Sequence, residues 1–368
     1  MRRKEIGKWV LLALLGIGIF QIFLPQQEIS TAERRRLAKR PEISIVGIKD
    51  GSYGEQLEEG LLDQFPGREA FRSIYAFVQQ KLLGKWDVAD YYVVAQNISK
   101  LDPVLEEKNV IRAAIQFSDI CSNYFPDADC YYAIIPDKNY FLAEENGYPA
   151  LDYERLSALM KENFTAGDEI VIEDLLELTD YYRTDLHWRQ EELLNVAEKM
   201  ISVMQQKEET GLLKGSFQMA SDRFYGGYAG ASGFMVKPDT LFYYESPMLS
   251  KVKVYDYEKQ EETGLYALEA LQEDALTDPY DLYLNGARAL LRLENPEALS
   301  EKKLVIFRDS FTSSLAPLLA EAYSEIILVD LRYVSLSYAM EIFDTGDYDT
   351  VLFLYHTGML NHSETLRF

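Results

Sequence analysis

The chain has 368 residues, of which 48% are hydrophobic and 26% charged, a composition typical of one large globular domain or of two. Residues 1–40 carry nine Lys/Arg and three Asp/Glu, a net +6, whereas the remainder carries 28 and 57, a net −29. Nucleic-acid binding depends on basic contacts to phosphates, so we expect no nucleic-acid partner for so acidic a body.

The amino terminus is typical of a membrane anchor. A basic stub, residues 1–7, precedes an apolar segment, residues 8–24, and no small-x-small cleavage site follows. The basic residues within 34–40 favour a body on the cytoplasmic side, because positively charged residues that flank a span prefer that side. The basic cluster at the amino terminus lies closer to the membrane and favours a body outside the cytoplasm. We therefore expect an uncleaved, single-pass transmembrane signal anchor in the cell membrane, with a cytoplasmic stub and an extracytoplasmic body.

Two segments follow the predicted anchor. Residues 25–50 are predicted to be a juxtamembrane linker. Residues 51–89 show apolar side chains at helical spacing, interrupted at Pro66-Gly67, and are predicted to form a helical hairpin or a bent helix that leads into the core.

Residues 90–368 alternate short apolar runs with helical stretches. The runs are residues 131–135, 170–172, 304–307, 326–329 and 351–355, and the helical stretches are residues 152–162, 189–206, 314–323 and 335–344. This alternation predicts an α/β fold with a doubly wound, mainly parallel sheet flanked by helices. The stretch at about 215–295 is less regular and is predicted to be an insertion that contains hairpins.

Cysteine and tyrosine content leaves two questions open. Cys121 and Cys130 lie nine residues apart. They either form a disulfide, as in an exported protein, or remain two free, buried thiols. The 26 tyrosines fit either packing at the edge of the core or a surface that faces carbohydrate.

Three residues form a candidate Ser-His-Asp triad. In an extended segment Asp185 and His187 would project to the same face, so that Asp185 holds one ring nitrogen while the other acts as a base. Ser310 follows the apolar run 304–307 just before a predicted helix, at the sheet edge where α/β folds bind ligands. Serine needs such a base to become a nucleophile.

The other two histidines and the Asp-x-His spacing offer alternative assignments. His356 follows the run 351–355 and is an alternative base, whereas His362 lies near the chain end and is expected at the surface. The Asp-x-His spacing also occurs in some metal sites, but the further ligands such a site needs are missing. We therefore expect no metal and no cofactor.

Three motifs together resemble a known family. The motifs are QFPGR at Gln64–Arg68, TDLHW at Thr184–Trp188 and RDSF at Arg308–Phe311. Together with the basic anchor, they resemble the DHHW family of bacterial exported proteins. That family is similar to the polysaccharide O-acetyltransferases AlgX and AlgJ, which have an SGNH-hydrolase-like domain. The resemblance covers roughly residues 40–368 and implies that residues 90–368 form such a domain.

Carried onto this chain, the resemblance implies Ser310 as nucleophile, His187 as general base and Asp185 as the residue that orients it. Two positions depart from the family pattern: Leu186 stands where the family has His, and Arg308 stands where a Gly-Asp-Ser block has glycine. The oxyanion donors are not assigned. The amide of Ser310 is the first candidate, and the others are Gly226, Gly227, Asn285 and Asn361.

The residues that flank the pair are candidates for substrate binding. Trp188 and Tyr182 could stack on a sugar ring or pack around the site, and Arg183 could steer an anionic sugar or be an ordinary surface residue.

The sequence therefore predicts an O-acyltransferase, in the first place an O-acetyltransferase, that acts on an exopolysaccharide or a cell-wall polymer. The expected partners are the polysaccharide acceptor and a membrane-bound O-acyltransferase that supplies acyl groups. A carbohydrate esterase of the same fold and a catalytically silent polysaccharide-binding or scaffold protein are the alternatives.

Overall fold

The computed structural model describes residues 8, 9, 16, 18, 20–30, 32–207, 213–273 and 275–368. The chain divides into two compact units, the smaller built from residues 1–89 and 229–235 and the larger from residues 90–228 and 236–368. The predicted basic stub, residues 1–7, and residues 10–15, 17 and 19 of the predicted anchor lie outside the described residues. In the part that is described, no helix is both long and apolar enough to cross a bilayer.

The smaller unit contains two helices where the sequence predicts a hairpin or a bent helix. Helix α3 (Ser52–Asp63) ends before Pro66, and α4 (Arg68–Phe77) begins after Gly67, whose φ of 71° lies in the left-handed region. Proline ends a helix and glycine tolerates positive φ, so this dipeptide separates the two helices.

The predicted linker, residues 25–50, carries secondary structure. It contains the strands β1 (Ile29–Ser30) and β2 (Arg35–Arg36) and the helix α2 (Ile45–Asp50). The Arg35 guanidinium donates to both carboxylate oxygens of Asp63 at 2.8 and 2.6 Å. This pairing holds the pKa of Asp63 below its ordinary value and fixes the hairpin to α3.

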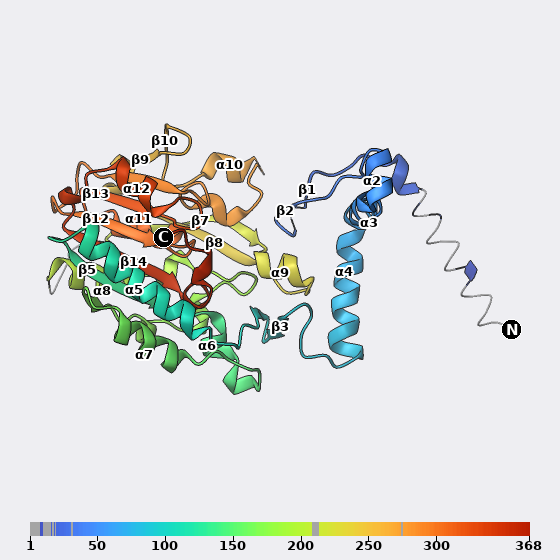
Figure 1. Ribbon diagram of the computed structural model, residues 1–368, viewed down its shortest axis with the longest axis horizontal. Helices are drawn as coiled ribbons and strands as arrows, with labels where there is room; N and C mark the ends of the chain where they lie inside the picture. The colour runs from blue at the N-terminus through green and yellow to red at the C-terminus, as the bar shows by residue number, and fades with distance from the viewer. Residues whose placement is uncertain are drawn as a thin grey trace. The chain divides into compact units, whose positions relative to one another are not determined.

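The larger unit is built around an eight-stranded sheet of order β10-β9-β11-β13-β12-β14-β5-β6 (Figure 1). Its strands are β5 (Asp129–Ile135), β6 (Asp168–Glu169), β9 (Lys253–Asp256), β10 (Glu261–Thr263), β11 (Leu290–Glu294), β12 (Lys303–Arg308), β13 (Glu325–Val329) and β14 (Thr350–His356). Strands β13, β12, β14, β5 and β6 pair in parallel, and β11, β9 and β10 extend the sheet in antiparallel fashion. The prediction of a mixed α/β fold with a mainly parallel sheet is confirmed.

Helices cover both faces of this sheet. Helices α5 (Glu107–Tyr124), α7 (Tyr153–Asn163), α12 (Leu336–Ile342) and α13 (Thr357–Asn361) pack on one face, and α8 (Leu194–Gln205) and α11 (Thr312–Leu319) pack on the other. The shorter helices α6 (Lys138–Leu142), α9 (Gly227–Ser232) and α10 (Leu268–Gln272) lie in connecting segments. In β12, Leu304 and Ile306 pack with α8 and α11, whereas Val305 and Phe307 pack with α5 and α7. Both faces are buried, which explains the uninterrupted apolar run.

The strand order reverses at β12, which has β13 on one side and β14 on the other. In open α/β sheets, ligands bind outside the carboxyl ends of strands at such a switch point. The residues that follow β12 are therefore placed where the fold expects a site.

Several predicted elements need correction. The irregular stretch 215–295 does contain a hairpin, β7 (Ser216–Phe224) with β8 (Asp239–Glu245), but its remainder supplies β9, β10 and β11 to the main sheet. The run 170–172 follows the short strand β6 and is not itself a strand. The stretch 189–206 is a 3₁₀ turn followed by α8.

Helix α5 is missing from the sequence-based prediction. Its buried residues recur at the three- and four-residue spacing of a helix face, namely Val110, Ala113, Ala114, Phe117, Ile120 and Cys121. Cys121 in α5 forms a disulfide with Cys130 in β5, which resolves the two alternatives that the sequence left open.

Candidate active site

Ser310 lies in the turn between β12 and α11. The Asp309 carboxylate accepts from the amide of Phe311 at 3.0 Å and so closes this turn. Helix α11 begins at Thr312, two residues before the predicted stretch 314–323, so Ser314 lies inside the helix. The serine is thereby held at the carboxyl edge of the sheet, directly after its central strand.

Asp185 and His187 lie in a closed loop rather than in an extended strand. Tyr181 and Trp188 form an antiparallel bridge at its base. Within the loop, Asp185 Oδ1 accepts from the backbone amide of His187 at 3.0 Å and lies 2.6 Å from its ring nitrogen Nδ1. One carboxylate oxygen thus fixes both the backbone and the ring of His187.

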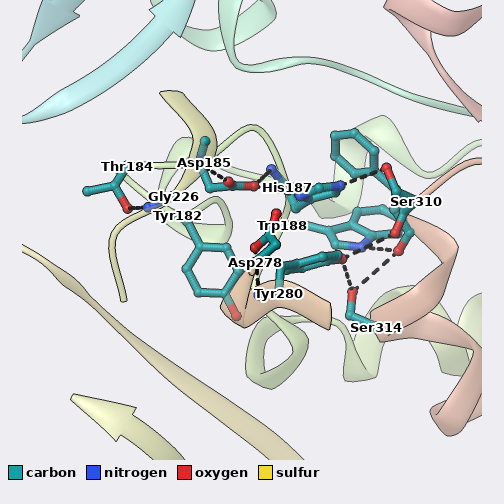
Figure 2. A network of polar contacts seen from close by, with 12 residues as sticks. Tyr182, Thr184, Asp185, His187, Trp188, Gly226, Asp278, Tyr280, Ser310 and Ser314 are labelled. Carbon is teal, nitrogen blue, oxygen red and sulfur yellow. Dashed lines mark hydrogen bonds and ion pairs between the residues drawn. The ribbon is translucent and has the colours of Figure 1, made fainter. Parts of the chain in front are cut away.

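The structure brings the three predicted catalytic residues together (Figure 2). His187 Nε2 lies 2.8 Å from Ser310 Oγ. An ionised carboxylate can only accept, so His187 Nδ1 carries the proton toward Asp185 and Nε2 is free to accept from the serine hydroxyl. Asp185 is fully buried and His187 is 5% exposed, which shields this chain of hydrogen bonds from water.

The second oxygen of Asp185 is held by the segment that follows β7. The amide of Gly227 donates to Asp185 Oδ2 at 2.7 Å, and the amide of Gly226 donates to Thr184 Oγ1 at 2.8 Å. A Cβ at position 226 would lie 2.3 Å from the Cβ of Asp185, so only glycine fits there. Both amides are engaged in holding the loop.

The predicted oxyanion donors are therefore reduced to one. Besides the two glycines, Asn285 bonds Gly264 O at an exposed turn, and Asn361 bonds residues 102, 104 and 106. The amide of Ser310 donates to no other group in the described part of the chain. It remains the candidate donor to an oxyanion formed at the serine.

Tyr280 is a site residue that the sequence did not reveal. Its ring stacks on the His187 imidazole with centroids 3.8 Å apart and an interplanar angle of 6° (Figure 2). Its hydroxyl donates to Ser314 Oγ at 3.0 Å, and burial raises the pKa of that hydroxyl well above its ordinary value. The phenol therefore stays neutral and fixes the plane of the imidazole.

The two aromatic residues proposed to stack on a sugar have no exposed face. Trp188 and Tyr182 are each 0% exposed, so the packing alternative holds and the stacking prediction is wrong. Trp188 Nε1 donates to the carbonyl of Phe311 at 2.9 Å and thus ties the histidine loop to the serine turn. The Tyr182 hydroxyl lies 3.2 Å from that of Tyr283.

Arg183 keeps a partly exposed side chain. It pairs with Asp239 at 3.0 Å and retains 37% of its side-chain exposure. Its part in substrate binding stays a prediction.

The other histidines do not contact Ser310. His356 Nδ1 lies 2.7 Å from Asp309 Oδ2, and its amide donates to the same oxygen at 2.8 Å. Burial alone would raise the pKa of Asp309, but the His356 ring brings it below its ordinary value. His362 is exposed and lies 2.9 Å from Asp102. His356 therefore supports the turn that carries Ser310 through its two contacts with Asp309.

Arg308, which stands in place of the family glycine, also supports this turn. Its side chain is fully buried and donates to Ser313 Oγ at 2.8 Å and to the carbonyl of Arg288 at 3.1 Å. The side chain thus ties the end of β12 to α11 and to the residues that precede β11.

The fold is similar to that of solved bacterial proteins. A DHHW family protein from Eubacterium siraeum matches with a TM-score of 0.61 and 18% identity, over 75% of this chain and 92% of that chain. PatB1 from Bacillus cereus, in a structure with a sulfonyl adduct, matches with a TM-score of 0.59 and 17% identity, over 73% and 95% of the two chains. No protein-family model and no curated protein matches the chain. The resemblance to the DHHW family is confirmed at the level of the fold.

Proposed function

We propose that this protein is an extracytoplasmic O-acyltransferase, specifically an O-acetyltransferase, that modifies a polysaccharide through Ser310, His187 and Asp185. The observation that carries the proposal is the chain of two hydrogen bonds, 2.6 Å from Asp185 to His187 and 2.8 Å from His187 to Ser310. Such a chain supplies a nucleophile, its base and the group that orients the base.

In the first half-reaction, Ser310 Oγ attacks the acyl carbonyl of the donor while His187 Nε2 takes the hydroxyl proton. The Ser310 amide stabilises the oxyanion of the tetrahedral intermediate. The bond between the acyl carbon and the donor oxygen then breaks, and His187 returns its proton to that oxygen. The product is an ester on Ser310.

In the second half-reaction, a sugar hydroxyl takes the place of the donor. His187 Nε2 accepts its proton, the sugar oxygen attacks the ester carbonyl, and the bond to Ser310 Oγ breaks as the proton returns to the serine. If water attacks instead of a sugar, the same residues catalyse ester hydrolysis. The identity of the attacking hydroxyl therefore decides between a transferase and an esterase.

The cellular setting is part of the proposal. Disulfides persist in oxidising compartments, so the Cys121–Cys130 bond supports an extracytoplasmic body. The basic stub and the apolar segment at residues 1–24 support a membrane anchor. An anchored enzyme would receive acyl groups from a membrane-bound O-acyltransferase and pass them to a polysaccharide.

The experiment that tests the proposal follows acetyl release from nitrophenyl acetate by the purified protein and its Ser310→Ala and His187→Ala variants. We expect the wild type to release nitrophenol and both variants to lose at least about 1,000-fold in rate. Addition of oligosaccharides then separates a transferase, which yields acetylated sugar, from an esterase, which yields only acetate. No release by any protein would favour the silent polysaccharide binder.

A further inference from the structure

A buried lysine lies beneath the loop that carries Asp185 and His187. Lys138 is the first residue of α6, three residues after the end of β5, and is 1% exposed. Lysine is almost never fully buried unless its charge is compensated. The proposed reaction mechanism does not use this residue.

The surroundings of Lys138 Nζ consist of backbone carbonyls. It donates to the carbonyl oxygens of Tyr182 at 2.8 Å, Asp185 at 3.1 Å and Arg183 at 3.2 Å, and also to that of Ile98. Three of these four carbonyls belong to the loop from Tyr181 to Trp188. An ammonium group has three protons to donate and a neutral amine only two, so this environment suits the charged form.

The charge of Lys138 acts close to the triad. Within the described residues no carboxylate forms an ion pair with Lys138, but Asp185 and Asp239 act on its charge from a greater distance. The centroid of the Tyr228 ring lies 5.6 Å from Lys138 Nζ. Burial lowers the pKa of Lys138 to about 7, while the two carboxylates oppose that change. The amine is therefore charged below neutral pH.

The β3–β4 hairpin completes the arrangement. Strands β3 (Tyr91–Val94) and β4 (Asn97–Lys100) form this hairpin, and the amide of Ile98 donates to the carbonyl of Arg183 at 2.8 Å. Lys138 thus joins α6, the hairpin and the histidine loop at one point.

We propose that Lys138 is a positioning residue that holds the loop of Asp185 and His187 through its carbonyls, and that its positive charge opposes protonation of the His187 ring. This inference rests on the proposed function, because a base must be neutral to accept the Ser310 proton. The groups that face the ring directly are the Asp185 carboxylate, the Ser310 hydroxyl and the Tyr280 phenol. Lys138 acts on the ring through the loop and through space.

The test is an NMR titration of the histidine rings, which does not depend on catalysis. The chain has three histidines, so labelling histidine with ¹⁵N and comparing with His187→Ala assigns the His187 signals in the full-length protein. In Lys138→Met we expect the His187 signals to titrate at higher pH than in the wild type, because a nearby positive charge disfavours the protonated ring. The exposed Lys199→Met is the matched control and should leave the titration unchanged.

Two further readouts keep the outcomes distinct. Lys138→Gln still donates two hydrogen bonds without a charge, so this variant should fold even if Lys138→Met does not. Its His187 signals should move to higher pH as in Lys138→Met.

If Ser310 is acylated in the wild type, the pH profile of acylation should move in the same direction in both variants. If Ser310 is not acylated, the proposed function fails while the titration still tests Lys138. An unchanged His187 titration in a folded variant would overturn the inference. Failure of both variants to fold would also overturn it, because Lys138 would then serve folding alone.

Discussion

Tyr280 shows how a residue without chemistry of its own can control the base. Its ring lies parallel to His187 at 3.8 Å, and its hydroxyl is anchored on Ser314. We predict that Tyr280→Leu lowers the rate of Ser310 acylation by about 10- to 100-fold, because the imidazole loses the surface that fixes its plane. Tyr280→Phe keeps the stacked ring and should retain most of the rate. Equal rates for the leucine variant and the wild type would contradict this role.

Asp309 gives a prediction for pH dependence. Its pKa is lower in the folded protein than its ordinary value, so the folded state binds this proton less readily than the unfolded chain. The stabilisation it provides is therefore complete above about pH 4 and is lost as the pH falls through the folded pKa. We predict that Asp309→Asn is less stable than the wild type at pH 6 and that the difference shrinks below about pH 4. Urea unfolding at several pH values measures this; a difference that stays constant down to pH 3 would contradict it.

The three residues of the proposed triad could be predicted from the sequence, whereas the residues that support them could not. Asp185, His187 and Ser310 stand in short motifs whose chemistry is visible from residue type and spacing. Tyr280 lies 30 residues before Ser310 in an irregular stretch, and nothing local signals that its ring stacks on a histidine. Trp188 was visible as a neighbour of the pair, but only the structure shows that its complete burial leaves no face for a sugar and that its hydrogen bond to Phe311 ties two loops together.

The loop that carries Asp185 depends on the segment that follows β7. A side chain at position 226 would overlap Asp185 Cβ at 2.3 Å and the carbonyl of Thr184 at 2.5 Å. We predict that Gly226→Ala shifts Asp185, lowers the acylation rate by at least about 10-fold and destabilises the protein by about 1–3 kcal/mol. Gly264→Ala, where the nearest atom lies 3.6 Å away, is the control and should change neither quantity. A Gly226→Ala variant as active and as stable as the control would contradict the assigned close contact.

The elements that the sequence predicted best are the ones buried on both faces. Strands β5, β12, β13 and β14 are continuous apolar runs, and such runs leave little ambiguity once helices alternate with them. Strands β9 and β11 were taken for an insertion because they mix charged with apolar residues, as strands near the edge of an antiparallel extension do. Their place in the main sheet is set by the pairing of β11 with β13, to which β9 is joined through β11; these contacts link segments distant in sequence.

At the scale of the whole molecule, net charge should limit which acceptors the proposed transferase can use. The residues beyond position 40 carry a net −29, so their field repels polyanions. We predict that the protein binds neutral polysaccharides more tightly than uronate-rich ones of similar length. Binding of the uronate-rich polymers should strengthen as salt rises from about 0.01 to 0.15 M, because the screening length falls from roughly 30 to 8 Å. Affinity electrophoresis at several salt concentrations measures both; tighter binding of polyanions at low salt would contradict the prediction and point to a local role for Arg183.

The central claim is that Ser310 carries the acyl group. Its most direct test is mass spectrometry of the purified protein after brief exposure to nitrophenyl acetate and acid quenching, with Ser310→Ala and His187→Ala treated in parallel. We expect one acetyl group on the peptide that contains Ser310 in the wild type, none there in Ser310→Ala, and very little in His187→Ala. Turnover of the ester with the acetyl group on another residue, or equal labelling of that peptide in His187→Ala, would contradict the account.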